Sequence, residues 1–155
     1  MIRRRRIALV AAVPGLILLL GAGDVPLSGG LWEIRNTPGV ATLDGRELNE
    51  LPIEPIETQK ICISPAEAAD PVRFFARDMD EGCTIKSASA AGGKVKIVGT
   101  CPNQIEGPDG SFELTGGHSA EAYEIDFATT AFGDNGRMTF SGKLNGRRVG
   151  DCPAE

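Results

Sequence analysis

Four cysteines, one histidine and two groups of carboxylates are the side chains of this chain with the most chemical potential. The cysteines are Cys62, Cys83, Cys101 and Cys152, and no two of them form a C-x-x-C pair. Zinc sites and dithiol redox centres need that close spacing, so that two thiolates reach one ion or each other. An even number of widely spaced cysteines predicts two disulfides and an oxidising compartment instead.

His118 would have to be the base of any Ser-His-Asp mechanism, because the chain has no other histidine. Ser111 and Ser119 are candidate nucleophiles, but the sequence lacks the G-x-S-x-G elbow. A metal site with several histidines is excluded by the count alone. We therefore interpret His118 as exposed or locally hydrogen-bonded, and we predict no catalytic residue, no cofactor and no metal site.

The carboxylate groups do not have the spacing of a known ligand loop. A calcium loop places oxygen ligands in a D-x-[DN]-x-[DN]-G series, which neither group contains. Paired carboxylates for glycoside hydrolysis need an aromatic cleft, for which this chain has few aromatic residues. Both groups are interpreted as hydrated surface charge: Asp78, Asp80 and Glu81 in one, and Glu47, Glu50 and Glu54 in the other.

The first 23 residues have the composition of a secretory signal peptide. Four arginines at positions 3–6 precede an apolar run at 7–20, and small residues at 21–23 precede Asp24. An uncleaved anchor is the alternative, but 14 apolar residues are short for a bilayer that needs about 20. We expect a signal peptide at 1–23 and a single exported, periplasmic domain at 24–155, with no stable membrane insertion after cleavage.

Cleavage would remove four basic residues and no acidic ones. The net charge would change from −5 to −9, with 12 basic residues against 21 acidic ones. Such a charge opposes binding to nucleic acid or to anionic lipid. A partner is expected to be an unidentified small molecule or another envelope protein.

Alternating apolar and polar residues predict a series of short strands separated by turn residues. The expected strands are residues 31–35, 56–63, 83–90, 95–101, 111–114, 122–129 and 137–144. Trp32 is expected to anchor the core from the first strand. Residues 36–55 contain three prolines and are expected to form a long irregular stretch, either a solvated loop or an edge excursion, and not a central strand. Turns are expected at 133–136 and at Asn145-Gly146.

One segment has the pattern of a helix start. Ser64-Pro65-Ala66-Glu67 fits a capping box with proline at the first helical position. Asp70-Pro71 can begin a second short helix, in which Val72, Phe75, Ala76 and Met79 share one face.

The hydrophobic pattern also selects a register for the hairpin around Gly92-Gly93. A two-residue turn pairs Ala91 with Lys94, whereas a three-residue loop pairs Ala90 with Lys94. Only the second gathers Cys83, Ile85, Val95, Ile97 and Cys101 on one face, and it is the register we predict. Together these elements predict a mainly β fold, an antiparallel meander that forms a curved sheet or a partial barrel with one or two short helices.

The order of these motifs resembles the bacterial domain-of-unknown-function family 3617. The matching features are Gly30-Leu31-Trp32-Glu33, Cys62 with its helix cap, Cys83 and Cys101 around a hairpin, Gly116-Gly117-His118-Ser119 ahead of Tyr123, and Arg148-Val149-Gly150-Asp151-Cys152-Pro153. The resemblance implies an envelope location and a disulfide-bonded β domain. It implies no established activity, substrate or catalytic residue.

Two arguments about the disulfides conflict. The hairpin register places Cys83 opposite Cys101, but chain order favours Cys62 with Cys83 and Cys101 with Cys152. We predict the pairing by chain order.

Three functions remain open at this point. A noncatalytic protein that binds a small apolar ligand or a protein partner on a curved sheet is the leading one. A structural or interaction protein without a small ligand is the second, and a hydrolase that uses His118 is the third. An apolar pocket with an open mouth would favour the first of them.

Overall fold

The computed structural model describes residues 25–48, 58–79, 82–103 and 107–154. The expected signal peptide at 1–23 lies outside the described residues. So do Glu50, Glu54, Asp80 and Glu81 of the carboxylate groups, and residues 56–57 of an expected strand.

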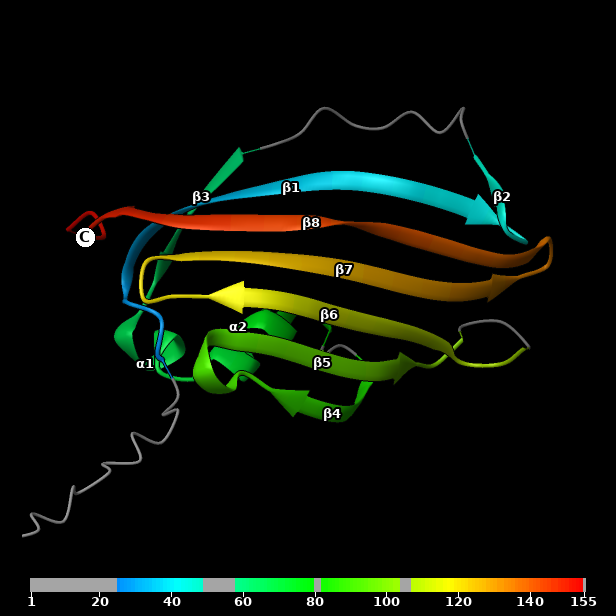
Figure 1. Ribbon diagram of the computed structural model, residues 1–155, viewed down its shortest axis with the longest axis horizontal. Coiled ribbons are helices and arrows are strands. Elements are labelled where there is room, and N and C mark those ends of the chain that lie inside the picture. The colour runs from blue at the N-terminus through cyan, green and yellow to red at the C-terminus, as the bar shows by residue number, and fades with distance from the viewer. Residues whose placement is uncertain (1–24, 49–57, 80–81, 104–106, 155) are drawn as a thin grey trace, which may run out of the picture.

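The described residues form one antiparallel sheet of eight strands that is not closed into a barrel (Figure 1). The order across the sheet is β2-β1-β8-β7-β6-β5-β4, and β3 pairs with the first part of β1. The predicted mainly β, open curved-sheet fold is therefore confirmed. The strands are β1 Gly30–Leu43, β2 Arg46–Glu47, β3 Thr58–Ile63, β4 Thr84–Ser89, β5 Lys94–Cys101, β6 Gly110–His118, β7 Ala122–Gly133 and β8 Gly136–Gly150.

The predicted helix starts are both present. α1 (Pro65–Ala68) begins with the capping box, in which the Glu67 N–H donates to Ser64 Oγ and the Ser64 N–H donates to Glu67 Oε2. α2 (Pro71–Ala76) begins with Asp70, whose carboxylate accepts from the Arg73 N–H, and continues into the 3-10 turn η1 (Arg77–Met79). Within the part of the chain that is described, no helix is long and apolar enough to cross a bilayer.

The two helices cover one end of one face of the sheet. Figure 1 shows α1 and α2 behind the sheet, toward the end where β3 lies. The predicted face of α2 and η1 packs there, with Ala76 buried and Val72, Phe75 and Met79 against the core. Phe74, which the sequence pattern did not select, is buried as well. The opposite face of the sheet is polar.

β1 is longer than expected: for residues 36–43 a solvated loop is wrong, whereas the alternative of an edge excursion fits, because most of this segment pairs with β8 alone. These residues continue the strand and pair with β8. Pro38 is tolerated because a bulge between Pro38 and Ala41 interrupts the ladder, where a missing N–H costs little. There the Val40 N–H donates to Ser141 Oγ, and that hydroxyl donates back to the Val40 carbonyl.

The turn predicted at Asn145-Gly146 is also wrong, because both residues lie inside β8 and pair with β1 and β7. Gly146 instead makes room for a packed side chain. The ring of Tyr123 lies against Gly146, in the space that a Cβ atom would occupy. The turn expected at 133–136 is confirmed between β7 and β8.

The hairpin of β4 and β5 contains both registers that the sequence allowed. Thr84 pairs with Thr100 and Ile85 with Gly99, as the three-residue loop predicts. A bulge at Lys86 then shifts the pairing by one residue, so that the end nearest the turn follows the two-residue register. The predicted register is therefore confirmed at the cysteine end and wrong at the turn end.

The disulfide pairing predicted from chain order is wrong. Cys62 is bonded to Cys152, and Cys83 is bonded to Cys101. Cys83 and Cys101 are placed opposite each other by the hairpin register, with Cα atoms 4.0 Å apart. Cys62 and Cys152 meet because β3 and the end of β8 both lie beside Leu31 of β1.

Candidate functional site

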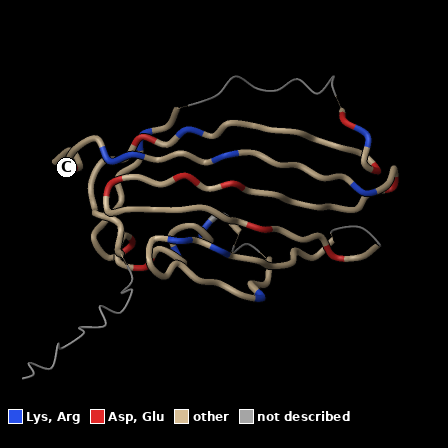
Figure 2. The backbone as a smooth tube through the Cα atoms, in the orientation of Figure 1, with Lys and Arg blue, Asp and Glu red and all other residues tan. Residues whose placement is uncertain are grey.

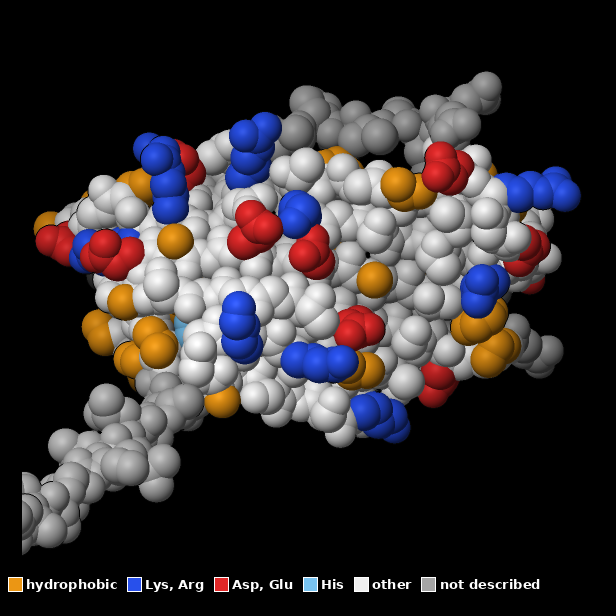
Figure 3. Space-filling model, viewed as in Figure 1, with side chains coloured by type: hydrophobic (Ala, Val, Ile, Leu, Met, Phe, Trp, Pro, Cys, Tyr) orange, Lys and Arg blue, Asp and Glu red, His pale blue; other side chains and the backbone are white. Residues whose placement is uncertain are grey.

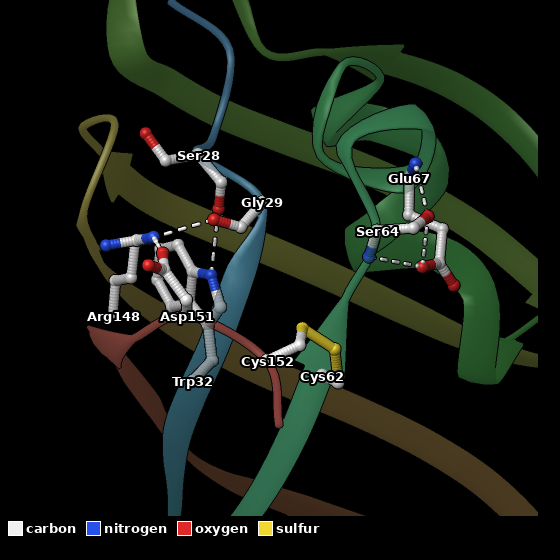
Figure 4. The surroundings of a disulfide bond; sticks show 9 residues. All are labelled: Ser28, Gly29, Trp32, Cys62, Ser64, Glu67, Arg148, Asp151 and Cys152. Atoms are coloured by element: carbon white, nitrogen blue, oxygen red, sulfur yellow. Dashed lines mark hydrogen bonds and ion pairs between the residues drawn. A yellow bond between two sulfur atoms is a disulfide. The ribbon is translucent and has the colours of Figure 1, made fainter. Parts of the chain in front are cut away.

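Most of the motifs that carry the family resemblance meet at the covered end of the sheet, where Figure 4 shows several of them, whereas Cys83 and Cys101 lie toward the other end. Trp32 is fully buried, and its Nε1 donates to the Ser28 carbonyl over 2.9 Å. Arg148 donates from Nε to the Gly29 carbonyl over 2.8 Å and pairs with Asp151. Gly30 has a φ of 137°, and a Cβ atom there would meet the Gly150 carbonyl and the Arg148 side chain. These motifs therefore build a structural corner.

An aromatic cluster fills the interior next to this corner. Tyr123 stacks on Trp32 with centroids 5.7 Å apart and meets Phe75 edge-on at 5.1 Å. Phe74 completes the cluster at 5.9 Å from Tyr123. Trp32 is thus the core anchor that the sequence predicted, and Tyr123, Ile125 and Phe127 share the face predicted for them.

His118 lies at the edge of this cluster. Its Nε2 is 3.2 Å from the Ala90 carbonyl, its ring centroid is 5.9 Å from that of Phe75, and Nδ1 is buried without a hydrogen-bond partner. The interpretation as a locally hydrogen-bonded histidine is confirmed. Ser111 lies at the opposite end of β6, and the Ser119 hydroxyl bonds to the backbone of its own turn. The described geometry brings none of these hydroxyls to the imidazole. The expectation that the chain is not an enzyme stays a prediction.

The carboxylates predicted to be surface charge are only partly described. Glu47 is exposed on β2, and the side chain of Asp78 lies outside the described set. Among the residues that are described, no group of three or more His, Cys, Asp or Glu side chains is placed to hold a metal ion.

The far end of the apolar sheet face extends past the helices. Cross-strand pairs place its side chains together, with Leu43 opposite Met138 and Ala41 opposite Phe140. Met138 is 47% exposed and Phe140 is 38% exposed, although both face the same side as the core. We call this region the open apolar surface: Ala41, Leu43, Phe127, Ala131, Met138 and Phe140.

A hollow adjoins the open apolar surface on the β6 side. Its volume is about 310 Å³, which is at the small end of the range for ligand sites. Phe112 and Met79 form its apolar wall, and Ala131 belongs to both the hollow and the open apolar surface. Cys101 brings the Cys83–Cys101 disulfide to its edge. Surface and hollow together form the candidate binding site.

Sequence reasoning found the strands that carry this site but not the site itself. Met138 and Phe140 were recognised as strand residues, and their alternation with polar neighbours indicated a buried face. Their exposure depends on where the short helices end over the sheet. The length of residues 65–79 is the only signal for that: two helices of four and six residues cannot cover strands of 12 to 15 residues.

Comparison with known proteins identifies the family and nothing further. No curated protein and no solved structure matches the chain. A family model described as "Protein of unknown function (DUF3617)" matches residues 27–152, which include all four cysteines and both helices. The chain therefore belongs to the DUF3617 family.

Proposed function

We propose that this protein binds a small amphiphile with one alkyl chain on the open apolar surface, and that it does so in the periplasm. The observation that carries the proposal is the exposure of Met138 and Phe140 on the core-facing side of the sheet. Phe140 is also in contact with Phe127, with ring centroids 5.6 Å apart. Exposed apolar side chains that adjoin one another mark binding surfaces more often than isolated ones do.

The size of the site favours a single alkyl chain. A hollow of about 310 Å³ has too little room for a bulky ring system, but it can take the end of a flexible chain. The rest of that chain would lie across Ala131, Met138 and Phe140. Methionine suits such a role, because its unbranched side chain adapts to ligands of varied shape.

The proposed location has two supports. The arginine-rich start and apolar run have the pattern of a signal peptide, and two disulfides suit an oxidising compartment. We expect the intact mass of the protein purified from its native host to correspond to a chain that begins near Asp24. A full-length mass from the membrane fraction would contradict this.

Binding can be measured with the fluorescent single-chain fatty acid cis-parinaric acid, displaced by lauric acid. Phe140→Ser removes an aromatic side chain whose complete burial is worth about 1.5–3 kcal/mol. Because 38% of Phe140 is exposed, a ligand that covers this surface gains about 0.6–1.1 kcal/mol of the burial free energy. The probe should bind about threefold to sixfold more weakly to the variant.

Val149→Ser is the matched control. Val149 is 41% exposed, close to the value for Phe140, but it lies near the end of β8 and away from the open apolar surface. Its substitution should leave probe affinity unchanged. Equal affinities for the wild type and Phe140→Ser, or equal losses in the two variants, would contradict the proposal. A concentration-dependent dimer that Phe140→Ser abolishes would instead identify a second copy of the chain as the occupant.

A further inference from the structure

The polar face of the sheet contains a depression that the proposed amphiphile site does not use. Its volume is about 710 Å³. Figure 3 shows this face, where charged side chains of both signs are interspersed. The depression lies over the β1, β8, β7 and β6 strands at the end of the sheet that carries the family motifs.

Strand register explains why the face is hollowed at this point. One cross-strand row runs through Arg35, Asn145, Glu124 and Gly117, and the next places Glu33, Arg147 and Ala122 side by side. Side chains in directly opposed positions lie about 5 Å apart. Gly117 and Ala122 are short and occupy adjoining positions in these rows. They form a floor, around which the longer charged side chains form the rim.

Charge pairing on this face leaves several basic side chains without a partner. Arg147 donates to Glu33 over 2.7 Å and 3.0 Å, and Lys143 pairs with both Glu124 and Asp126 over 3.0 Å. The side chains of Arg35 and Lys94 have no hydrogen-bond or ion-pair partner among the described residues. Both belong to the row that crosses the depression, because Lys94 pairs with Gly117. Figure 2 shows acidic positions along β7 and basic positions along the neighbouring β8.

The rim specifies a ligand that is anionic at one point and polar elsewhere. Arg35 offers a planar guanidinium, which suits a carboxylate, and the neighbouring amide of Asn145 offers a second donor. Glu33 and Glu124 would repel a compact, highly charged anion, but their oxygens accept hydrogen bonds from hydroxyl groups. We propose that the depression binds a carboxylated sugar, with its carboxylate on Arg35 and its hydroxyls toward Glu33 and Glu124.

The proposal is tested by titrating the isotopically labelled, oxidised full domain with D-glucuronate and following backbone amide signals. The amides of Gly117, Ala122 and Asn145 should shift together along one binding curve. Arg35→Gln should weaken binding by about tenfold or more, because it removes a charge-assisted pair. D-glucose, which lacks the carboxylate, should bind wild type at least about tenfold more weakly for the same reason.

Two further variants separate the site from general charge effects. Arg46→Gln makes the same charge change on the exposed strand β2, outside the depression, and should leave the affinity for glucuronate unchanged. Ala122→Trp fills the floor without changing charge and should abolish the shifts. Amide shifts that persist in Arg35→Gln or Ala122→Trp would overturn the proposal, as would their absence in the wild type. Succinate that binds as tightly as glucuronate would overturn the role of the hydroxyls.

Discussion

Gly146 is a residue at which a single added methyl group should strongly destabilise the fold. Its neighbour across the strand is Tyr123, and a Cβ atom at position 146 would overlap the Cε1 and Cζ atoms of the tyrosine ring. The ring has no free direction in which to move, because Tyr123 is only 7% exposed and contacts Trp32, Phe74 and Phe75. Gly146→Ala must therefore displace the aromatic cluster or shift the backbone of β8.

The size of the effect follows from these contacts. Overpacking a dense core costs about 1–3 kcal/mol, and each disturbed aromatic pair adds about 0.5–1.5 kcal/mol. We expect Gly146→Ala to lower the free energy of unfolding by about 2–4 kcal/mol, out of a total of about 5–15 kcal/mol for a domain of this size. Urea unfolding of the oxidised protein, followed by far-UV circular dichroism, measures this directly.

Gly133→Ala is the matched control for this substitution. Gly133 ends the neighbouring strand β7, and a Cβ atom there would meet no atom within 4 Å. It should leave stability unchanged or raise it by about 0.4–1 kcal/mol. In a Tyr123→Leu background most of the cost of Gly146→Ala should disappear, giving a coupling energy of about 1 kcal/mol or more. A cost below about 0.5 kcal/mol, or an undiminished cost in that background, would refute the packing argument.

Three other predictions concern the disulfides, the helix cap and the core. Nonreducing tryptic mapping should recover Cys62 joined to Cys152 and Cys83 joined to Cys101, and a Cys62–Cys83 peptide would contradict the fold. Loop entropy for separations of 90 and 18 residues gives about 4.6 and 3.2 kcal/mol, so removal of the Cys62–Cys152 bond should lower the free energy of unfolding more than removal of the Cys83–Cys101 bond. Hydrogen bonds from Ser64 lower the pKa of Glu67 below its ordinary value of 4.5, so this carboxylate stabilises the fold above about pH 4.5 and loses that effect as the pH falls through the lowered pKa. Glu67→Gln should flatten the pH dependence of stability in this range, and a profile identical to that of the wild type would show that the helix cap does not cause it. Phe74→Ala should lower the free energy of urea unfolding by about 3–5 kcal/mol because Phe74 is 6% exposed. Phe140→Ala should lower it by less because the Phe140 ring is partly in water, and the reverse order would show that the helices do not form the core.

Local sequence rules predicted the parts of the fold that depend on neighbouring residues. The capping box at Ser64, the Asp70 cap and the turn at 133–136 are each settled within four residues, and all three are confirmed. Alternation also identified the inward face of β7 correctly. These features need no knowledge of which strand lies next to which.

Apart from the bulge in the β4–β5 hairpin, the features that were predicted wrongly depend on distant partners. Pro38 by itself favours a loop. Pairing with β8 overrides this preference, because a bulge next to Pro38 accommodates the missing N–H. Asn145-Gly146 has the composition of a turn, but Gly146 is needed because the Tyr123 ring occupies the space of a Cβ atom there. Cys62 could not be assigned to Cys152 without knowing that β1 lies between β3 and β8. The candidate site was missed for the same reason, since it depends on where α2 stops over the sheet.

The Cys62–Cys152 bond has a consequence for how the sheet fluctuates. It joins the two neighbours of β1 beside Leu31, so the beginning of β1 is enclosed between strands that cannot separate. Toward the other end, from Asn36 to Val40, the described residues pair β1 with β8 alone. We expect amide hydrogens at Leu31 and Glu33 to exchange with solvent much more slowly than those of the segment around Val40. Local opening of the sheet would then concentrate at the end that carries the open apolar surface. The strands there could shift to fit ligands with alkyl chains of different length.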